Sequence, residues 1–323
     1  MSEFRQIDAG EVTLRAAIEG PEPGTAPLAL LVHGFPESWY SWRHQLAPIA
    51  AAGYTACAID VRGYGGSDKP HPVEAYAMER LIGDVVGVKQ ALSPDRPAVL
   101  IGHDWGAPIV WNSAFTHPDH FSAVAGLSVP FTGVPMRPFT EVFREHFTSQ
   151  GRWFYQEYFQ EPGVAEAELE SDPRDSVARF MYAISGDVPH SDFWAKPVGA
   201  NLLDGMPDPA PLDWLTEQDR DYYGEQFAAS GFRGPLNRYR NHERDFEYFQ
   251  QFKGRTLDQP ALFIGGTSDP ASTGFGAIED PVALMRMFAP NVEGHMLEGC
   301  GHWTQQERPD EVNALLIDWL NRL

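Results

Sequence analysis

VLIGHDWGA, residues 99–107, is the stretch of sequence that decides the fold. A short apolar run leads into Gly102, and a second glycine, Gly106, lies two residues beyond Asp104. Glycine tolerates the strained and crowded backbone of a tight turn better than any other residue. The stretch therefore predicts a buried strand, a sharp turn with Asp104 at its apex, and a helix that begins directly afterwards.

This layout is typical of a nucleophile elbow, in which serine is the more usual residue at the apex. The start of the following helix supplies backbone N–H groups and the positive end of the helix dipole. Both favour an ionised Asp104 carboxylate at neutral pH. An aspartate at this position is also a common helix cap, so the motif alone leaves a purely structural role for Asp104 open.

Two later segments supply the partners that a nucleophile needs. A glycine-rich loop just before the final helix carries His302, and Asp269 follows a buried strand by a short loop. Nucleophile, acid and base follow one another along the chain in this order in proteins that carry the elbow. Asp280 is the alternative acid, but no apolar strand precedes it, and the loop at 128–133 contains no acid. We therefore expect Asp269 to orient His302.

The segment His33-Gly34-Phe35-Pro36 ends an apolar run early in the chain. Acyl-transfer chemistry needs backbone N–H groups that stabilise a developing oxyanion. Pro36 has no N–H, so the donor in this segment has to be Phe35. Together with the N–H of Trp105, it is expected to form the oxyanion hole, although a simple turn would also fit this segment on its own.

Strands and helices alternate at both ends of the chain but not in its middle. Apolar runs predict strands at 28–32, 55–60, 98–102, 123–129 and 260–265; helical spacing predicts helices at 42–52, 76–92, 107–115 and 309–323; a hairpin is expected at 4–18. Apolar strands that alternate with helices are typical of a parallel sheet covered on both faces. The middle section is rich in aromatic, acidic and proline residues, with a Pro- and Gly-rich loop at 186–211. We predict an α/β core of residues 1–130 and 250–323, interrupted by a mostly helical cap of residues 131–249.

Composition excludes several classes of function. The 323 residues are 43% hydrophobic, which suffices for a sizeable core, and carry 45 acidic against 24 basic side chains, a net charge of −21. Such a charge repels phosphate backbones and anionic lipid, so neither nucleic acid nor a membrane surface is an expected partner. The two cysteines, Cys57 and Cys300, suggest reduced buried thiols. No apolar stretch suits a signal peptide or approaches the roughly 18 residues of a membrane-spanning helix. We expect a cytoplasmic protein, and a homo-oligomer is compatible with the sequence.

With these motifs in place, the chain from about Leu28 to Leu323 resembles the soluble epoxide hydrolases of the α/β-hydrolase superfamily. The likeness is carried by HGFPESW (33–39), RGYG (62–65), GHDWG (102–106), GHWTQ (301–305) and two cap segments, YQEYFQEPG (155–163) and GFRGPLNRYRN (231–241). It implies the α/β-hydrolase fold: a mostly parallel central sheet flanked by helices, with an inserted helical cap.

The resemblance also implies site residues that spacing alone could not single out. One tyrosine from each cap segment, Tyr155 and Tyr239, would point at the epoxide oxygen, with Tyr158 the nearest alternative in the first segment. Phe35, Trp105, both tyrosines and Trp303 would line the substrate pocket. No cofactor is implied, and no metal-ligand spacing such as His-Glu-x-x-His occurs in the sequence. The expected partner is a small-molecule epoxide.

A carboxylate nucleophile suits an alkylating substrate. Attack of Asp104 on an epoxide carbon gives an ester that water can cleave to a vicinal diol, whereas serine would give an ether that cannot be hydrolysed in this way. One alternative is a haloalkane or haloacid dehalogenase, which shares the aspartate but needs halide-binding donors instead of a tyrosine pair. The other is a non-catalytic ligand receptor on the same fold, which would not need Asp104, Asp269 and His302 together. The sequence therefore favours an epoxide hydrolase.

Overall fold

A single eight-stranded sheet organises the computed structural model, which describes residues 2–188 and 196–323. Its strands are β1 Glu3–Asp8, β2 Thr13–Glu19, β3 Leu28–Val32, β4 Thr55–Ile59, β5 Ala98–His103, β6 Phe121–Leu127, β7 Ala261–Gly266 and β8 Val292–Leu297. Their order across the sheet is β1-β2-β4-β3-β5-β6-β7-β8. The β1–β2 and β2–β4 pairs are antiparallel and all other pairs are parallel. The predicted hairpin and mostly parallel sheet are confirmed.

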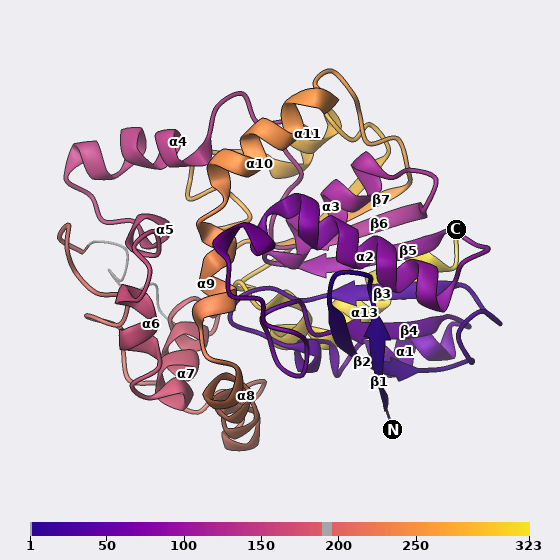
Figure 1. Ribbon diagram of the computed structural model, residues 1–323, viewed down its shortest axis with the longest axis horizontal. Coiled ribbons are helices and arrows are strands. Elements are labelled where there is room, and N and C mark those ends of the chain that lie inside the picture. Colours follow the sequence, from indigo (N-terminus) through magenta and orange to yellow (C-terminus); the bar gives the residue numbers. More distant parts are fainter. Residues whose placement is uncertain (1, 189–195) are drawn as a thin grey trace.

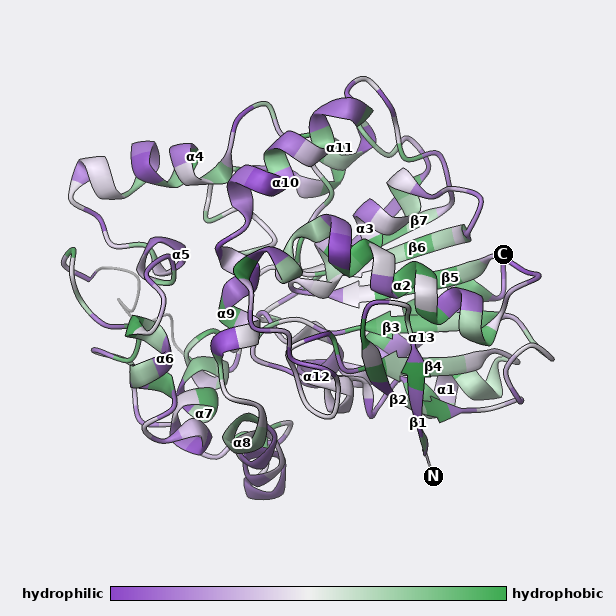
Figure 2. Ribbon diagram, in the orientation of Figure 1, coloured by the Kyte–Doolittle hydropathy of each residue, from purple (hydrophilic) through white to green (hydrophobic). Residues whose placement is uncertain are grey.

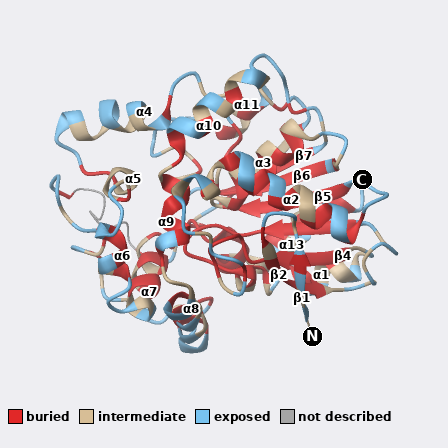
Figure 3. Cartoon of the chain, in the orientation of Figure 1, coloured by how far each residue is buried: buried red, intermediate tan, exposed pale blue. Residues whose placement is uncertain are grey.

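The central strands are apolar throughout because both faces of the sheet are covered. Leu28, Leu30 and Val32 of β3 face the core shared with α2 (Met78–Leu92) and α3 (Gly106–Thr116), while the alternate side chains face α1 (Leu46–Ala51) and α13 (Pro309–Leu320). Figure 1 shows α2 and α3 lying across the front of the sheet. The strands are mainly hydrophobic in Figure 2 and buried in Figure 3. The sheet is thus packed between two apolar layers.

The α-helices between β6 and β7 lie to one side of the sheet (Figure 1). They are α4 Phe139–His146, α5 Tyr155–Tyr158, α6 Val164–Leu169, α7 Pro173–Ala183, α8 Glu217–Ser230, α9 Arg233–Tyr239 and α10 His242–Phe249. Helix α8 is largely hydrophilic on its visible surface (Figure 2). Of the predicted loop at 186–211, residues 189–195 lie outside the described residues, and the remainder contains turns and no helix or strand. No helix in the described part of the chain is long and apolar enough to cross a membrane.

The helix predicted at 42–52 is shorter than expected. The structure has a 3-10 turn at Trp39–Trp42 and starts α1 at Leu46. The cause is Pro48, which has no N–H for an intrahelical hydrogen bond and tolerates only the first turn of a helix. The helix therefore begins just before Pro48 and ends near Gly53, whose φ is +95°.

Strand β8 and helix α11 (Pro281–Arg286) were not predicted. Strand β8 reads VEGHML and lies at the edge of the sheet, where its four middle residues are only half-buried. It therefore lacks the continuous apolar run that marks the central strands. Helix α11 is only six residues long, too short for helical spacing to be recognised.

Candidate active site

Asp104 occupies the turn between β5 and α3, with a φ of +49°. A Cβ atom at Gly102 would lie 2.3 Å from the carbonyl oxygen of Gly106, and one at Gly106 would lie 2.0 Å from the carbonyl oxygen of Val32. Neither position can hold a larger residue without moving the backbone. The predicted strand, turn and helix are confirmed, and the strained turn holds the Asp104 carboxylate clear of the sheet.

The two carboxylate oxygens of Asp104 have different neighbours. The backbone N–H of Phe35 donates to Oδ1 at 2.7 Å, and Nε2 of His302 lies 3.3 Å from Oδ2. A Cβ at Gly34 would lie 2.3 Å from Oδ1, so this close approach requires glycine. Trp105 occupies the N-cap position of α3, and its N–H therefore belongs to the same turn. The loop after β3 and the elbow after β5 meet at one carboxylate.

His302 and Asp269 are both buried and in contact. Nδ1 of His302 lies 3.0 Å from Oδ1 of Asp269. Ser128, directly after β6 with a φ of +71°, donates from Oγ to Oδ2 of Asp269 at 2.5 Å, and the same Oγ lies 2.9 Å from Nδ1 of His302. Asp280, the alternative acid, instead caps α11 by accepting from the N–H of Ala283. The structure thus brings Asp104, His302 and Asp269 into one chain of contacts.

These contacts control the charges of the site. Burial by itself lowers the pKa of His302, but Asp269 and Asp104, which attract and hydrogen-bond the imidazolium, together raise that pKa well above its ordinary value. Burial raises the pKa of Asp269, and the opposing attraction and hydrogen bonds of His302, with that of Ser128, leave it below its ordinary value. The free site therefore favours an imidazolium between two carboxylates.

A second buried network holds the loops that carry Phe35 and His302. Glu37 accepts from the N–H of Gly34 at 3.0 Å and lies 2.8 Å from Nδ1 of His103. The other ring nitrogen of His103 lies 2.7 Å from the carbonyl oxygen of His302. Glu37 and His103 therefore join the two loops beneath Asp104. Neither this network nor Ser128 was predicted, because each residue acts through neighbours distant in sequence.

The two cap tyrosines lie side by side above the elbow. Tyr155 begins α5 and Tyr239 ends α9, and their ring centroids are 6.0 Å apart. Nε2 of Gln160 donates to the carbonyl oxygens of Gln156 and Tyr239, at 2.7 and 2.9 Å. This amide fixes the two tyrosine-bearing segments relative to each other. Tyr158 differs, because its hydroxyl donates to Glu168 of α6 at 2.8 Å.

Burial, followed by repulsion from Asp104, raises the pKa of both tyrosine hydroxyls above the ordinary value. Tyr155 and Tyr239 are therefore neutral phenols over the physiological range. A neutral phenol can donate a proton or a hydrogen bond to an oxygen that develops negative charge.

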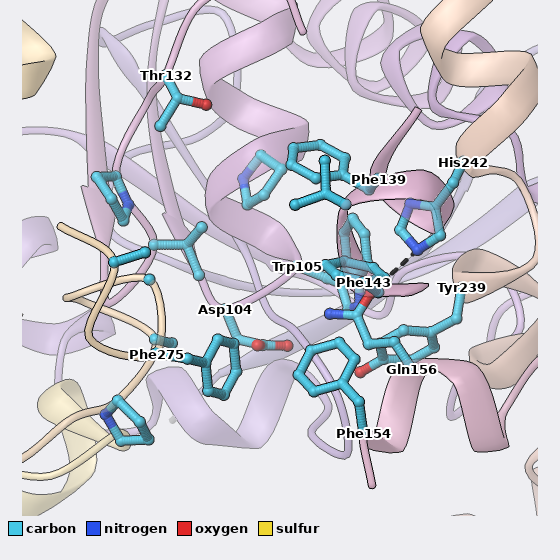
Figure 4. Close-up of a pocket in the computed structure, with 18 of the residues that line it drawn as sticks. Asp104, Trp105, Thr132, Phe139, Phe143, Phe154, Gln156, Tyr239, His242 and Phe275 are labelled. Atoms are coloured by element: carbon cyan, nitrogen blue, oxygen red, sulfur yellow. Dashed lines mark hydrogen bonds between the residues drawn. The ribbon is translucent and has the colours of Figure 1, made fainter. Parts of the chain in front are cut away.

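A cavity of about 640 Å³ lies between the elbow and the cap. Its walls include Phe35, Asp104, Trp105, Tyr155, Tyr239, Asp269 and His302. Phenylalanines from α4 and from the loops before α5 and after β7 supply much of the remaining surface (Figure 4). The described residues contain no cluster of three or more His, Cys, Asp or Glu that could hold a metal ion. The cavity suits a mostly apolar molecule with a polar group at Asp104.

Trp303, expected to line the pocket, does not belong to its wall. Its side chain is fully buried, and the indole N–H donates to the carbonyl oxygen of Met181 at 2.7 Å. The ring packs against His302, with centroids 4.7 Å apart. The structure therefore corrects the expectation that Trp303 contacts substrate. Its ring packs against His302, and its indole N–H is hydrogen-bonded to a backbone carbonyl of the cap.

Comparison with known proteins first defines the fold family of this chain. Residues 27–309 match the family described as the alpha/beta hydrolase fold. Epoxide hydrolase A of Mycobacterium tuberculosis (strain ATCC 25618 / H37Rv) is 42% identical over 99% of this chain and 97% of its own length. Bifunctional epoxide hydrolase 2 of Rattus norvegicus is 40% identical over 97% of this chain and 55% of its own.

Solved structures agree with the sequence comparison. Epoxide hydrolase A from Mycobacterium thermoresistibile superposes with a TM-score of 0.92 at 42% identity, over 99% of this chain and 98% of that one. An epoxide hydrolase from an endophytic Streptomyces gives 0.91 at 44% identity, over 99% and 95%. The chain therefore belongs to the epoxide hydrolases of the α/β-hydrolase fold family.

Proposed function

We propose that this protein hydrolyses small-molecule epoxides to vicinal diols through a covalent ester on Asp104. One observation carries the proposal: the Asp104 carboxylate faces the apolar cavity with His302 beside it and two neutral tyrosines in the same cavity wall. A nucleophile, a base and proton donors for an alkoxide are thus present at one site.

In the first step, Oδ2 of Asp104 attacks a ring carbon of the epoxide. The Phe35 N–H holds Oδ1, which leaves Oδ2, beside Nε2 of His302, as the attacking oxygen. The carbon–oxygen bond of the strained ring breaks, and its electron pair stays on the oxygen. A hydroxyl of Tyr155 or Tyr239 supplies a proton to that oxygen, so no metal ion is required for charge neutralisation.

In the second step, water cleaves the ester. Esterification removes the charge of Asp104, and with it one of the attractions that raise the pKa of His302. The His302 imidazolium then gives up a proton, which restores the phenol of the tyrosine that protonated the epoxide oxygen. The neutral imidazole takes a proton from water, and Asp269 stabilises the imidazolium that results. Hydroxide attacks Cγ of Asp104, and the oxyanion forms at Oδ1, where the N–H groups of Phe35 and Trp105 can stabilise it. The bond between Cγ and the alkyl oxygen then breaks, and the leaving alkoxide takes the proton of the new carboxyl group. The diol leaves, and the Asp104 carboxylate and the His302 imidazolium are restored.

We also propose the division into a core of residues 1–130 and 250–323 and a cap of residues 131–249. It is supported by the strands, which lie within 3–127 and 261–297, and by α4–α10, which lie between them. A cytoplasmic location fits the two buried, unpaired cysteines, Cys57 and Cys300.

The experiment that tests the function compares diol formation from styrene oxide by wild type, Asp104→Ala and a control, Asp280→Ala. Diol from wild type and the control but none from Asp104→Ala would establish the reaction and the nucleophile. His302→Gln should accumulate an adduct heavier by one substrate mass in intact-protein mass spectrometry, because ring opening continues while hydrolysis stops. Halide release from a haloalkane, with no diol from any epoxide in a panel of aryl and alkyl epoxides, would contradict the proposal.

A further inference from the structure

The Gln156 side chain lies between one of the proposed proton donors and a histidine of the cap. Its Nε2 lies 2.9 Å from the Tyr155 hydroxyl oxygen. Its Oε1 lies 3.0 Å from Nε2 of His242, a contact drawn as a dashed line in Figure 4. Tyr155 and Gln156 belong to α5 and His242 begins α10. The three side chains form one line of hydrogen bonds along the cavity wall.

His242 is buried among aromatic rings. Its ring centroid lies 5.5 Å from that of Phe143, 5.9 Å from that of Phe139 and 6.1 Å from that of Trp105. Burial, and then the nearby Arg238 cation, lower the pKa of His242 to about 3. The imidazole is therefore neutral at pH 7 and carries a single N–H.

The position of that N–H follows from its partner. The carbonyl oxygen of the Gln156 amide can only accept a hydrogen bond. The 3.0 Å contact with Nε2 of His242 therefore places the imidazole proton on Nε2. The other half of the amide, the NH₂ group, then faces Tyr155 and donates to its oxygen.

The orientation of this amide decides what Tyr155 can do. As a hydrogen-bond acceptor from Gln156, the Tyr155 hydroxyl does not give its own proton to the amide. In the opposite orientation, the amide oxygen would take the Tyr155 proton and the NH₂ group would face His242. The donor to the epoxide would then be lost, although every side chain remained in place.

We infer that His242 and Gln156 are positioning residues that hold the Tyr155 hydroxyl as a proton donor to the epoxide oxygen. The inference rests on the proposed function. His242 donates through Nε2, Gln156 transmits the direction of the hydrogen bond, and Tyr155 delivers a proton into the cavity.

Gln156 also supports the chemical step itself. As the epoxide oxygen takes the proton, negative charge grows on the Tyr155 oxygen, and the Gln156 N–H stabilises it. This hydrogen bond lowers the pKa of Tyr155, against the larger effects of burial and of Asp104. Gln160 holds the backbone of Gln156 against that of Tyr239, so the amide has little freedom to move away.

The test measures the rate of ester formation in single turnovers with styrene oxide, followed by tryptophan fluorescence because Trp105 adjoins Asp104. His242→Phe keeps an aromatic ring but removes the donor, and we expect ester formation to slow about fivefold, the worth of one neutral hydrogen bond. Gln156→Met should do the same. His242→Gln retains an N–H and should stay within about twofold of wild type. His120→Phe, far from the cavity wall, is the matched control.

A double-mutant cycle separates positioning from general packing. In a Tyr155→Phe background, His242→Phe should cause no further slowing, because its effect passes through the missing hydroxyl. An equal slowing in both backgrounds, or an unchanged rate in His242→Phe and Gln156→Met, would overturn the inference. If His242→Phe fails to fold, Gln156→Met carries the same cycle. Failure of the proposed function is distinguishable, since wild type itself would then form neither ester nor diol.

Discussion

At the scale of single residues, the tyrosines of the two cap segments differ in their surroundings. Tyr155 and Tyr239 line the cavity, whereas the Tyr158 hydroxyl is bound to Glu168. We expect Tyr155→Phe and Tyr239→Phe each to slow ester formation by at least tenfold and the double variant nearly to abolish it, because general acid catalysis is worth about 10²–10⁴-fold. Tyr158→Phe is the matched control. A double variant with the wild-type rate in single turnovers would exclude both tyrosines as donors.

The low pKa of His242 leads to a second prediction, which concerns the free energy of unfolding at acidic pH. Its pKa is about 3 in the folded protein, against an ordinary value of about 6.5 in the unfolded chain. Between these values the unfolded state binds a proton that the folded state does not, so the free energy of unfolding falls as pH falls below about 6.5.

At pH 5 this single group should cost wild type about 2 kcal/mol relative to pH 7. His242→Gln has no titrating group there and should lose correspondingly less stability. Urea unfolding of both proteins at pH 7 and pH 5 measures the difference, and all other titrating groups cancel. Equal losses in the two proteins would mean that His242 titrates normally in the fold.

Residues that act through a sequence motif were predictable, and residues that act through tertiary contacts were not. Asp104 could be found because the glycines on either side of it are a local requirement of the turn. Ser128 and Gln156 have no such signal: each matters only because distant segments bring a partner to it. The family resemblance implies Trp303 as a pocket residue, but a shared motif does not fix which side of a loop faces a cavity, and Trp303 is not among the residues that line it.

At the scale of elements, the central strands of the sheet could be predicted from the sequence, whereas the edge strand β8 could not. Strands β3, β4 and β5 were predictable because burial on both faces demands continuous apolar runs. Strand β8 was not, since an edge position tolerates polar residues. The start of α1 was not predicted because it is determined by one residue, Pro48, and not by helical spacing.

Helix α2 offers a matched pair of glycines one turn apart. A Cβ at Gly83 meets nothing within 4 Å, whereas a Cβ at Gly87 would lie 2.2 Å from the carbonyl oxygen of Ala9, at the end of β1. We expect Gly83→Ala to raise the free energy of unfolding by up to about 1 kcal/mol, through helix propensity alone.

Gly87→Ala has the same propensity gain but must push the hairpin away from α2. We expect a net loss of about 1–3 kcal/mol, the usual cost of overpacking. Urea unfolding of the two variants beside wild type measures both effects. If Gly87→Ala were as stable as Gly83→Ala, the contact between α2 and the hairpin would not be close.

At the scale of the whole molecule, the cap and the core are joined by a buried ion pair next to the site. Arg238 of α9 pairs with Asp245 of α10 and donates to the carbonyl oxygen of Tyr76, while Asp245 accepts from the N–H of Met78 at the start of α2. The guanidinium lies over the ring of Trp105, 4.7 Å from its centroid. One junction thus links two cap helices, the core and the residue after the nucleophile.

This junction gives the last prediction. Burial lowers the pKa of Arg238 to about 9, so the guanidinium is still a cation at pH 7. Asp245→Asn leaves that cation buried without its counter-ion, and we expect a loss of about 3–5 kcal/mol in the free energy of unfolding by urea. Glu145→Gln breaks the exposed pair with Arg137 and should cost less than about 1 kcal/mol.

Adding Arg238→Met to Asp245→Asn removes both buried charges, so the double variant should regain most of the lost stability. It should nevertheless form the ester more slowly than wild type, because Tyr239, next in the chain, would no longer be held against the core by its neighbour. Asp245→Asn keeps a side-chain oxygen that can accept from the N–H of Met78, so both variants can keep that hydrogen bond. A double variant as unstable as Asp245→Asn would therefore contradict the unpaired buried cation as the source of the loss.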